Sequence, residues 1–365
     1  MNILVVYLGR KGGGARYTYE LVKELSKKAS VSLLVSKQAE NIKSYESLNL
    51  SLYSINTFNN YFSFLLSSFK LPFIRKIVKQ IILRDKIDIA LSTMTHVWNG
   101  FIFTANIMNK TPYVLTIHDA LPHSGEGNFL LNYLNNRDTK NARAYISLTE
   151  HVKNQLISIH GKNKEIYVLP LGSFGFKDGK VKNWDGITPL RILFFGRIHE
   201  YKGIDLLLDA AIFLQKNHDI ELSIYGQGDL SIYAEKIKEI KKIKIENRWV
   251  DDSEIGDILH EHDICVIPYK DASQSGVIPS AQYAGLPTIV NPVDGLVEQI
   301  EKDKTSLITD GINSESLALC IEKIIDNPSL VNSLSLGSLE YAEKRLSWSP
   351  IVSELMVISN EIIKK

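Results

Sequence analysis

Short apolar runs alternate with longer segments of helical period along most of the chain. In the first half, the apolar runs predict strands at residues 2–7, 31–36, 88–92, 112–117, 144–148 and 166–169. The amphipathic segments predict helices at 15–27, 69–84, 98–108 and 150–159. Strands are predicted again at 191–195, 220–225, 243–246, 263–267, 287–290 and 306–308. This alternation is typical of parallel sheets covered by helices, and it predicts an α/β protein with two Rossmann-like domains.

The boundary between these domains is predicted from a change in composition. Residues 171–189 are rich in glycine and polar side chains and have no sustained period, so they are interpreted as a linker. The first domain then covers residues 1–170 and the second covers 190–348. A chain of 365 residues, 44% hydrophobic and 23% charged, has enough apolar material for two cores.

The cysteines and the apolar runs indicate the compartment. Cys265 and Cys320 lie far apart in segments predicted to be a strand and a helix, which argues against a disulfide framework or a zinc site. The chain starts directly with the strand 2–7, without the pattern of a signal peptide, and contains no run of 18 apolar residues. We therefore expect a cytoplasmic location and no membrane span.

Charge is distributed unequally between the two halves. The net charge is +1, yet residues 1–170 hold 21 Lys and Arg against 11 Asp and Glu, and the remainder holds 21 against 30. Within 69–86, apolar residues are interleaved with the cations Lys70, Arg75, Lys76, Lys79, Arg84 and Lys86. A basic amphipathic helix of this kind either contacts an anionic membrane peripherally or is a surface helix with a solvated face. No nucleic acid partner is expected, because no binding motif accompanies the charge.

The segment 191–210, RILFFGRIHEYKGIDLLLDA, carries the clearest candidate chemistry. Gly196 ends the apolar strand and Gly203 opens an amphipathic helix, so Arg197 and Lys202 lie at the carboxyl end of a strand. Ligands of open α/β sheets bind at this edge, and a helix N-terminus adds N–H groups there. The sequence therefore predicts a phosphate-binding site.

Two further segments come directly after predicted strands of the first half. Gly13 and Gly14 lie where a strand turns into a helix, so the backbone can pass close to a ligand. This cluster lacks a full Gly-x-Gly-x-x-Gly fingerprint and does not by itself separate a phosphate cradle from a tight turn. His96 and His118 follow other strand ends, and a histidine in that place is either structural or functional.

Several of these segments, taken together, resemble the retaining nucleotide-sugar glycosyltransferases of family 4. The resemblance rests on FFGRIHEYKGIDLLLDA, IYGQGD, residues 263–290 and GLVE, with LGRKGGGARYTYEL and TIHD in the first half. It implies the GT-B fold, with two Rossmann-like domains facing each other across a deep cleft. The tail RLSWSPIVSEL resembles the closing helix of the family, so residues 349–365 are expected to return to the first domain.

The resemblance also implies a reaction and a set of site residues. The reaction is a hexosyltransferase-type (EC 2.4) transfer from a UDP- or GDP-sugar to a glycan hydroxyl, retaining and without metal or other cofactor. Arg197 and Lys202 match the cations that stabilise the leaving diphosphate, and His118 matches the donor-sugar contact. The donor-binding candidates are Gly13, Gly14, Gly196, Arg248, Trp249, Asp271, Gln274, Ser275, Gly276, Val277 and Glu298; the acceptor-side candidates are Arg16 and His96.

One block departs from the family pattern. Where the family carries two glutamates separated by seven residues, this chain has either Ala272 and Ser280 or Ser273 and Ala281. Asp271 or Gln274 is a candidate substitute for the first glutamate. The N–H groups of residues 275–277 are expected to face the diphosphate.

Two alternatives stay open beside an active transferase. The missing glutamates suit an inactive glycosyltransferase-like subunit that binds nucleotide or glycan. An NAD(P)-dependent oxidoreductase fits less well, since Val35-Ser36-Lys37 supplies no acidic residue after the second strand. For an active enzyme, the basic first domain favours a lipid-linked glycan acceptor in capsule or O-antigen assembly at the inner membrane surface.

Overall fold

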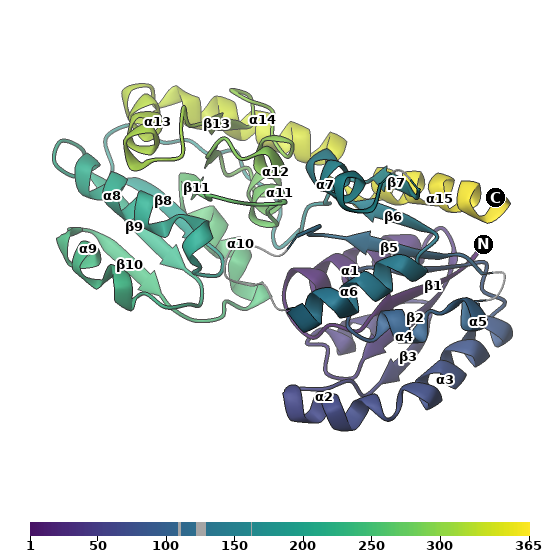
Figure 1. Ribbon diagram of the computed structural model, residues 1–365. Helices are drawn as coiled ribbons and strands as arrows, with labels where there is room; N and C mark the ends of the chain where they lie inside the picture. The colour runs from purple at the N-terminus through teal and green to yellow at the C-terminus, as the bar shows by residue number, and fades with distance from the viewer. Residues whose placement is uncertain (109–110, 122–128, 162) are drawn as a thin grey trace. The chain divides into compact units, whose positions relative to one another are not determined.

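Two parallel β-sheets, each with its own core, organise the chain (Figure 1). The computed structural model describes residues 1–108, 111–121, 129–161 and 163–365. One compact unit is Met1–Leu171 together with Trp348–Lys365, and the other is Gly172–Ser347. The chain therefore leaves the first unit, completes the second and returns to the first.

The first unit contains a seven-stranded sheet in the order β3-β2-β1-β4-β5-β6-β7. Its strands are β1 Asn2–Tyr7, β2 Ser30–Ser36, β3 Ser51–Ile55, β4 Ile89–Ser92, β5 Tyr113–Ile117, β6 Ala144–Ser147 and β7 Glu165–Val168. Every residue of β4, β5 and β6 is buried, as expected for strands covered on both faces. The predicted strands are confirmed, and the short strand β3, in which Ser51 and Ser54 interrupt the apolar residues, was not predicted.

The helices of the first unit are α1 Gly13–Leu25, α2 Tyr61–Ser68, α3 Leu71–Arg84, α4 Asn99–Ile102, α5 Ala105–Met108, α6 Phe129–Asn141, α7 Glu150–His160 and α15 Trp348–Lys364, with a 3₁₀ turn at Ile42–Ser47. The prediction of one helix over 98–108 is wrong. The backbone leaves the helical region at Phe103, whose buried ring stacks on Tyr113 at 4.7 Å. Helices α2 and α6 were not predicted from the sequence.

The basic helix predicted over 69–84 corresponds to α3, and its apolar side is occupied. Ile74, Val78 and Ile81 lie in the core of the first unit. The buried apolar residues of α3 therefore serve packing within the first unit. A contact of α3 with a membrane would have to use the side chains on its exposed side.

The second unit contains a six-stranded sheet in the order β10-β9-β8-β11-β12-β13. Its strands are β8 Leu190–Phe195, β9 Ile220–Tyr225, β10 Ile243–Glu246, β11 Ile264–Ile267, β12 Thr288–Val290 and β13 Ser306–Ile308. Its helices are α8 Ile204–Leu214, α9 Ala234–Glu239, α10 Asp252–Glu261, α11 Val277–Tyr283, α12 Asp294–Val297, α13 Ser314–Asp326 and α14 Ser329–Arg345, with 3₁₀ turns at Glu200–Lys202 and Ser231–Tyr233. All six strands lie within one residue of their predicted positions.

The predicted linker is part of the second unit. Residues 172–189, all of which are described, form no helix or strand. The buried Lys182 Nζ nevertheless donates hydrogen bonds to the carbonyls of Leu259 (3.0 Å) and His260 (2.7 Å), at the carboxyl end of α10. A lysine in this place satisfies carbonyls that a helix end leaves without partners, and it anchors the segment.

The last helix, α15, packs on α1 of the first unit. Lys28 Nζ donates to the Ser349 carbonyl (2.7 Å) and to the Ser353 hydroxyl (2.7 Å). The Trp348 ring meets Tyr17 edge-on, with 5.5 Å between ring centroids. Residues at opposite ends of the sequence therefore share one core.

Candidate functional site

The strand order of each sheet contains one point where successive connections diverge. In the second unit, β8 connects to β9 on one side, while its other neighbour is β11. In the first unit, β1 connects to β2 on one side, while its other neighbour is β4. Ligands of open α/β sheets bind outside the carboxyl ends of strands at such points. The loops to consider are 196–203 and 268–277 in the second unit, and 8–12 and 93–98 in the first.

Glycines allow the loops of the second unit to pack tightly. Gly196 (φ +129°) and Gly226 (φ +152°) follow β8 and β9, and a Cβ on Gly226 would lie 1.8 Å from the Gly196 carbonyl oxygen. Gly203 (φ +68°) starts α8, and a Cβ there would lie 1.9 Å from the Pro268 carbonyl oxygen. The backbones after β8, β9 and β11 therefore meet at one corner of the sheet.

Arg197 and Lys202 gather at this corner around two tyrosines. Lys202 Nζ lies 3.6 Å from the ring centroid of the buried Tyr269 and 4.9 Å from that of Tyr201. Arg197 Nη2 lies 3.5 Å from the Tyr201 hydroxyl. Burial raises the pKa of Tyr269. Aromatic faces attract cations, so the rings hold positive charge at the end of β8.

The loop after β11 is held by Gln299, which the sequence analysis missed. The Ser275 N–H donates to Gln299 Oε1 (2.7 Å), and Gln299 Nε2 donates back to the Ser275 carbonyl (3.1 Å). The Val277 N–H donates to Ser275 Oγ (3.3 Å). Two of the three N–H groups expected to face a diphosphate therefore bond within the protein. Among the described residues, none accepts a hydrogen bond from the Gly276 N–H.

The positions of the missing family glutamates are all buried. Ala272, Ser273, Ser280 and Ala281 are each at most 5% exposed. A Cβ on Gly295 would lie 2.3 Å from the Ala272 carbonyl oxygen, so the start of α12 packs directly on this loop. Asp271 is exposed and Gln274 is half-buried, so these two are the polar side chains that the loop presents next to the buried positions.

Glu298 lies at the carboxyl end of α12, where it is exposed. A short helix, α12, therefore separates this donor-binding candidate from the end of β12. A carboxylate there faces the negative end of the helix, which is not a favourable cap.

Arg248 and Trp249, after β10, are both exposed, but the Arg248 side chain is held in place by ion pairs. Both terminal nitrogens of Arg248 bond the two carboxylate oxygens of Glu254 (2.8 and 2.7 Å), and Arg248 Nε bonds Glu246 (3.2 Å). This pairing lowers the pKa of Glu254 to about 2. The guanidinium therefore braces the loop, whereas the Trp249 ring is 42% exposed and offers a face to a planar group.

The glycine-rich loop of the first unit surrounds a carboxylate. The Gly12 N–H donates to Glu40 Oε1 (2.8 Å) at the start of α1. A Cβ on Gly13 would meet nothing within 4 Å, while one on Gly14 would lie 2.6 Å from the Met94 sulfur. There is therefore space beside the backbone at Gly13, whereas Met94 fills the space beside Gly14.

Arg16, on the first turn of α1, pairs with Glu20 (2.9 Å). This ion pair directs its guanidinium along the helix. Arg16 is half-buried in this position.

His118 is buried at the end of β5 with a defined tautomer. Its Nε2 lies 3.0 Å from the Thr93 carbonyl oxygen, which can only accept, so Nε2 carries the proton. Burial lowers its pKa and keeps the imidazole neutral. Tyr17 meets the ring edge-on at 5.1 Å, and Trp348 supports Tyr17 from the other side.

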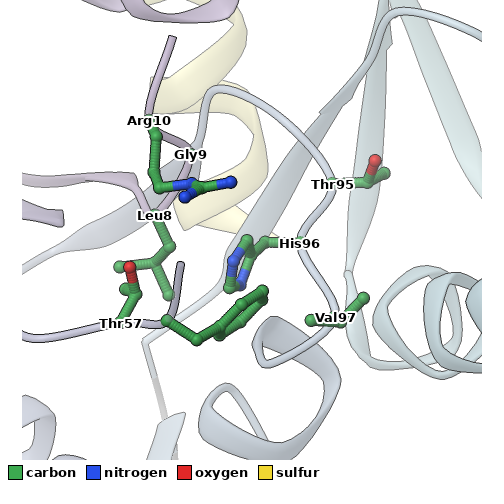
Figure 2. Close-up of a pocket in the computed structure, with 8 residues that line it drawn as sticks. Leu8, Gly9, Arg10, Thr57, Thr95, His96 and Val97 are labelled. Carbon is green, nitrogen blue, oxygen red and sulfur yellow. The ribbon is translucent and has the colours of Figure 1, made fainter. Parts of the chain in front are cut away.

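His96 lines a cavity of about 290 Å³ between the ends of β1, β3 and β4 (Figure 2). Figure 2 shows Arg10 and His96 on neighbouring walls of this cavity. The His96 ring stacks on Phe58 (5.6 Å), and Arg10 Nη1 donates to the Asn59 carbonyl (3.0 Å). Burial lowers the pKa of His96 to about 3, so the ring is neutral. Arg10 and Thr57 were missed, and the unpredicted strand β3 explains the second omission.

The buried carboxyl group of Asp138 holds the loop that forms one wall of the cavity. Asp138 Oδ2 accepts from the His96 N–H (3.4 Å) and from Asn99 Nδ2 (3.1 Å), and Oδ1 accepts from the Tyr113 hydroxyl (2.8 Å). Burial raises the pKa of Asp138 to about 7. The loop that carries His96 is therefore tied to α6.

Two family models match the chain, one for each unit. A model described as Glycosyltransferase Family 4 matches residues 11–172, and one described as Glycosyl transferases group 1 matches residues 189–327. The chain belongs to the family 4-type glycosyltransferases. This confirms the resemblance seen in the sequence.

Relatives and solved structures agree with this family. An uncharacterised glycosyltransferase of Methanocaldococcus jannaschii is 23% identical over 301 residues, which is 74% of each chain. An uncharacterised 41.2 kDa protein in the cps region of Klebsiella pneumoniae is 27% identical over 46% of each chain. The crystal structure of HepE of Anabaena superposes with a TM-score of 0.77 at 15% identity, covering 99% of this chain and 100% of that one. The glycosyltransferase therefore has the GT-B fold.

Neither a membrane span nor a metal cluster is found in the described part of the glycosyltransferase. None of the helices described has both the length and the apolar character needed to cross a bilayer. Within residues 1–108, 111–121, 129–161 and 163–365, no three His, Cys, Asp or Glu side chains gather in a way that could hold a metal ion.

Proposed function

We propose that this glycosyltransferase moves a sugar from a UDP-sugar to a hydroxyl of a glycan acceptor, with retention of anomeric configuration and without a metal ion. The observation that carries the proposal is the placement of Arg197 and Lys202 around Tyr201 and Tyr269, at the end of β8. HepE, which shares the fold, has been solved in complexes with UDP and with UDP-glucose. A GDP-sugar is the other donor class to be tested.

The reaction needs stabilisation of negative charge more than it needs a protein base. The bond between the anomeric carbon and the β-phosphate oxygen breaks, and the acceptor oxygen bonds the same carbon on the same face. The acceptor proton passes to the departing phosphate oxygen. Charge that develops on the diphosphate is stabilised by cations fixed before the reaction, which is the role we assign to Arg197 and Lys202.

The remaining candidates divide between donor and acceptor. Gly196 and the Gly276 N–H adjoin the diphosphate in this proposal, and the exposed Trp249 ring stacks on the base. The neutral His118 contacts the donor sugar. The cavity lined by Arg10, Thr57 and His96 takes the acceptor.

We further propose that the acceptor is a lipid-linked glycan of capsule or O-antigen type. The relative in the cps region of Klebsiella pneumoniae supports this assignment. So does the excess of Lys and Arg in residues 1–170, since such acceptors lie at an anionic membrane surface.

The test is nucleotide binding and sugar transfer in EDTA. Thermal stability is measured with UDP, GDP, CDP, ADP, dTDP and NAD for the wild type, Arg197→Ala and Lys216→Ala. Lys216 follows the far end of α8 and provides a matched loss of charge. We expect UDP to stabilise the wild type and Lys216→Ala, and Arg197→Ala to lose binding and at least about 10²-fold in transfer rate.

Other outcomes would change the function. Normal transfer by Arg197→Ala would contradict the assigned site. Stabilisation by NAD alone would indicate an oxidoreductase. Binding of UDP with no transfer to any glycan would favour an inactive subunit, an alternative that the buried positions of the two missing glutamates keep open.

A further inference from the structure

Helix α2 presents its apolar side chains to solvent. Phe62, Leu65, Leu66 and Phe69 are spaced as i, i+3, i+4 and i+7, which places them on one side of the helix and its last turn. They are 72%, 47%, 55% and 85% exposed. A surface helix of a soluble domain normally turns such a stripe toward the core.

The opposite side of α2 is the one that packs on the unit. The Phe64 ring meets Phe58 edge-on at 5.0 Å. Ser68 Oγ accepts a hydrogen bond from Trp98 Nε1 (3.1 Å). These contacts fix the orientation of the helix, so the exposed stripe does not result from a helix that is free to rotate.

The apolar stripe continues onto α3, where cations surround it. Phe73 is 66% exposed, and Lys70, Lys76 and Lys79 are exposed beside it. No Asp or Glu occurs between Tyr61 and Arg84. Figure 1 shows α2 and the start of α3 at the margin of the first unit. We call Phe62, Leu65, Leu66, Phe69 and Phe73, with Lys70, Lys76 and Lys79, the α2–α3 surface.

We propose that the α2–α3 surface binds an anionic lipid bilayer. The five apolar side chains enter the boundary between headgroups and acyl chains, and the three lysines contact lipid phosphates. Contiguous exposed apolar patches on soluble proteins mark interaction sites, and the charge of this one selects the partner. A symmetric dimer through the same surface would bring like charges together, which opposes self-association.

The surface also lies next to the proposed acceptor cavity. Phe58 lines that cavity and packs on Phe64, so α2 separates the cavity from the exposed stripe. A glycan whose lipid stays in the bilayer would then have its polar head near Arg10 and His96. This step rests on the proposed function, whereas bilayer binding does not.

The experiment is co-sedimentation of the full chain with vesicles, in the absence of any donor. Vesicles of phosphatidylcholine with about one third phosphatidylglycerol are compared with phosphatidylcholine alone, at low and high salt. The variants are Phe62→Ser/Leu66→Ser, Lys70→Gln/Lys76→Gln and the control Ile187→Ser/Ile232→Ser, which removes two exposed apolar side chains (86% and 73%) from the second unit. Circular dichroism and thermal unfolding show that each variant is folded.

We expect wild type and control to bind the anionic vesicles, with binding that weakens at high salt. The Phe62→Ser/Leu66→Ser variant should bind about tenfold more weakly or worse at either salt concentration. The Lys70→Gln/Lys76→Gln variant should lose binding mainly at low salt. Equal binding by all variants, or none to anionic vesicles, would overturn the proposal. A dimer that forms without lipid and dissociates in the Phe62→Ser/Leu66→Ser variant would also overturn it.

Discussion

Single residues that are distant in sequence set the charge distribution of the second unit. Lys202 Nζ is placed over the ring of Tyr269, at the end of a different strand. Gln299 exchanges two hydrogen bonds with the backbone of Ser275, and Gln282 Nε2 donates to the Gln299 carbonyl (3.1 Å). The cations and the loop that faces them are therefore fixed by side chains outside the recognisable motif. Such fixed groups stabilise developing charge without first having to reorganise.

Asp138 makes the stability of the first unit depend on pH. Burial raises its pKa from 3.8 to about 7, so between pH 4 and 7 the native state keeps a proton that the unfolded state has lost. The free energy of unfolding therefore falls as pH rises through this range. Relative to Asp138→Asn, the wild type should lose about 2 kcal/mol between pH 5 and 7.

Urea denaturation of both proteins at the two pH values measures this difference. The lowered pKa of His96 acts in the opposite direction, because its unfolded form binds a proton below about 6.5. It is present in both proteins and cancels in the comparison. A difference in stability that does not change with pH would contradict a raised pKa for Asp138.

At the scale of elements, the starts of α1 and α8 differ in how tightly they are enclosed. Gly203 has φ +68°, and a Cβ added to it would lie 1.9 Å from the Pro268 carbonyl oxygen. The start of α8 therefore packs directly on the loop after β11. Gly13 faces open space at the start of α1. One glycine is required by packing, and the other leaves room that a ligand can use.

We predict opposite effects from the same substitution at these glycines. Gly203→Ala should destabilise the second unit by more than about 2 kcal/mol, because it combines a strained backbone with a steric clash. Gly13→Ala should leave stability unchanged within about 1 kcal/mol, and it should reduce sugar transfer if the donor approaches this backbone.

Chemical denaturation and initial rates of transfer give both quantities. Full activity in Gly13→Ala would remove Gly13 from the donor site. A stable Gly203→Ala protein would show that the loop after β11 can move away from α8.

At the scale of the whole molecule, each unit has its own sheet and core, yet the first unit includes the last helix of the chain. Trp348 and Lys28 join α15 to α1, so this unit is complete only after the second has been synthesised. The phosphate-binding candidates Arg197 and Lys202 belong to the second unit alone.

Calorimetry should therefore resolve two unfolding transitions with different responses. UDP should raise the transition of the second unit, since binding to the native state stabilises it by mass action. Truncation after Ser347 should lower the transition of the first unit, because it exposes apolar side chains that α15 covers. A single transition that responds to both changes would mean that the units unfold together.

Most of the second unit could be predicted from local patterns. Strands β8, β9 and β11 are largely apolar and buried, and glycines follow β8 and β9. All six strands were located within one residue. The first unit was harder to predict, because serines interrupt the apolar residues of the short, partly exposed β3 and because α2 turns its apolar stripe outward. A rule that apolar residues are buried therefore finds neither element. The composition of the predicted linker, residues 171–189, did not reveal that Lys182 is buried and packs within the second unit.

The sequence by itself determined the family, the parallel sheets and the pair Arg197 and Lys202, because these depend on residues close together in the chain. The tertiary structure decided which predicted groups already form hydrogen bonds within the protein and which residues line a cavity. Arg248 is held by Glu254, Ser275 and Val277 use their N–H groups internally, and Arg10 joins His96 around a cavity. These points depend on hydrogen bonds and packing, including contacts between distant segments such as Ser275 with Gln299, which the alternation of strands and helices does not encode.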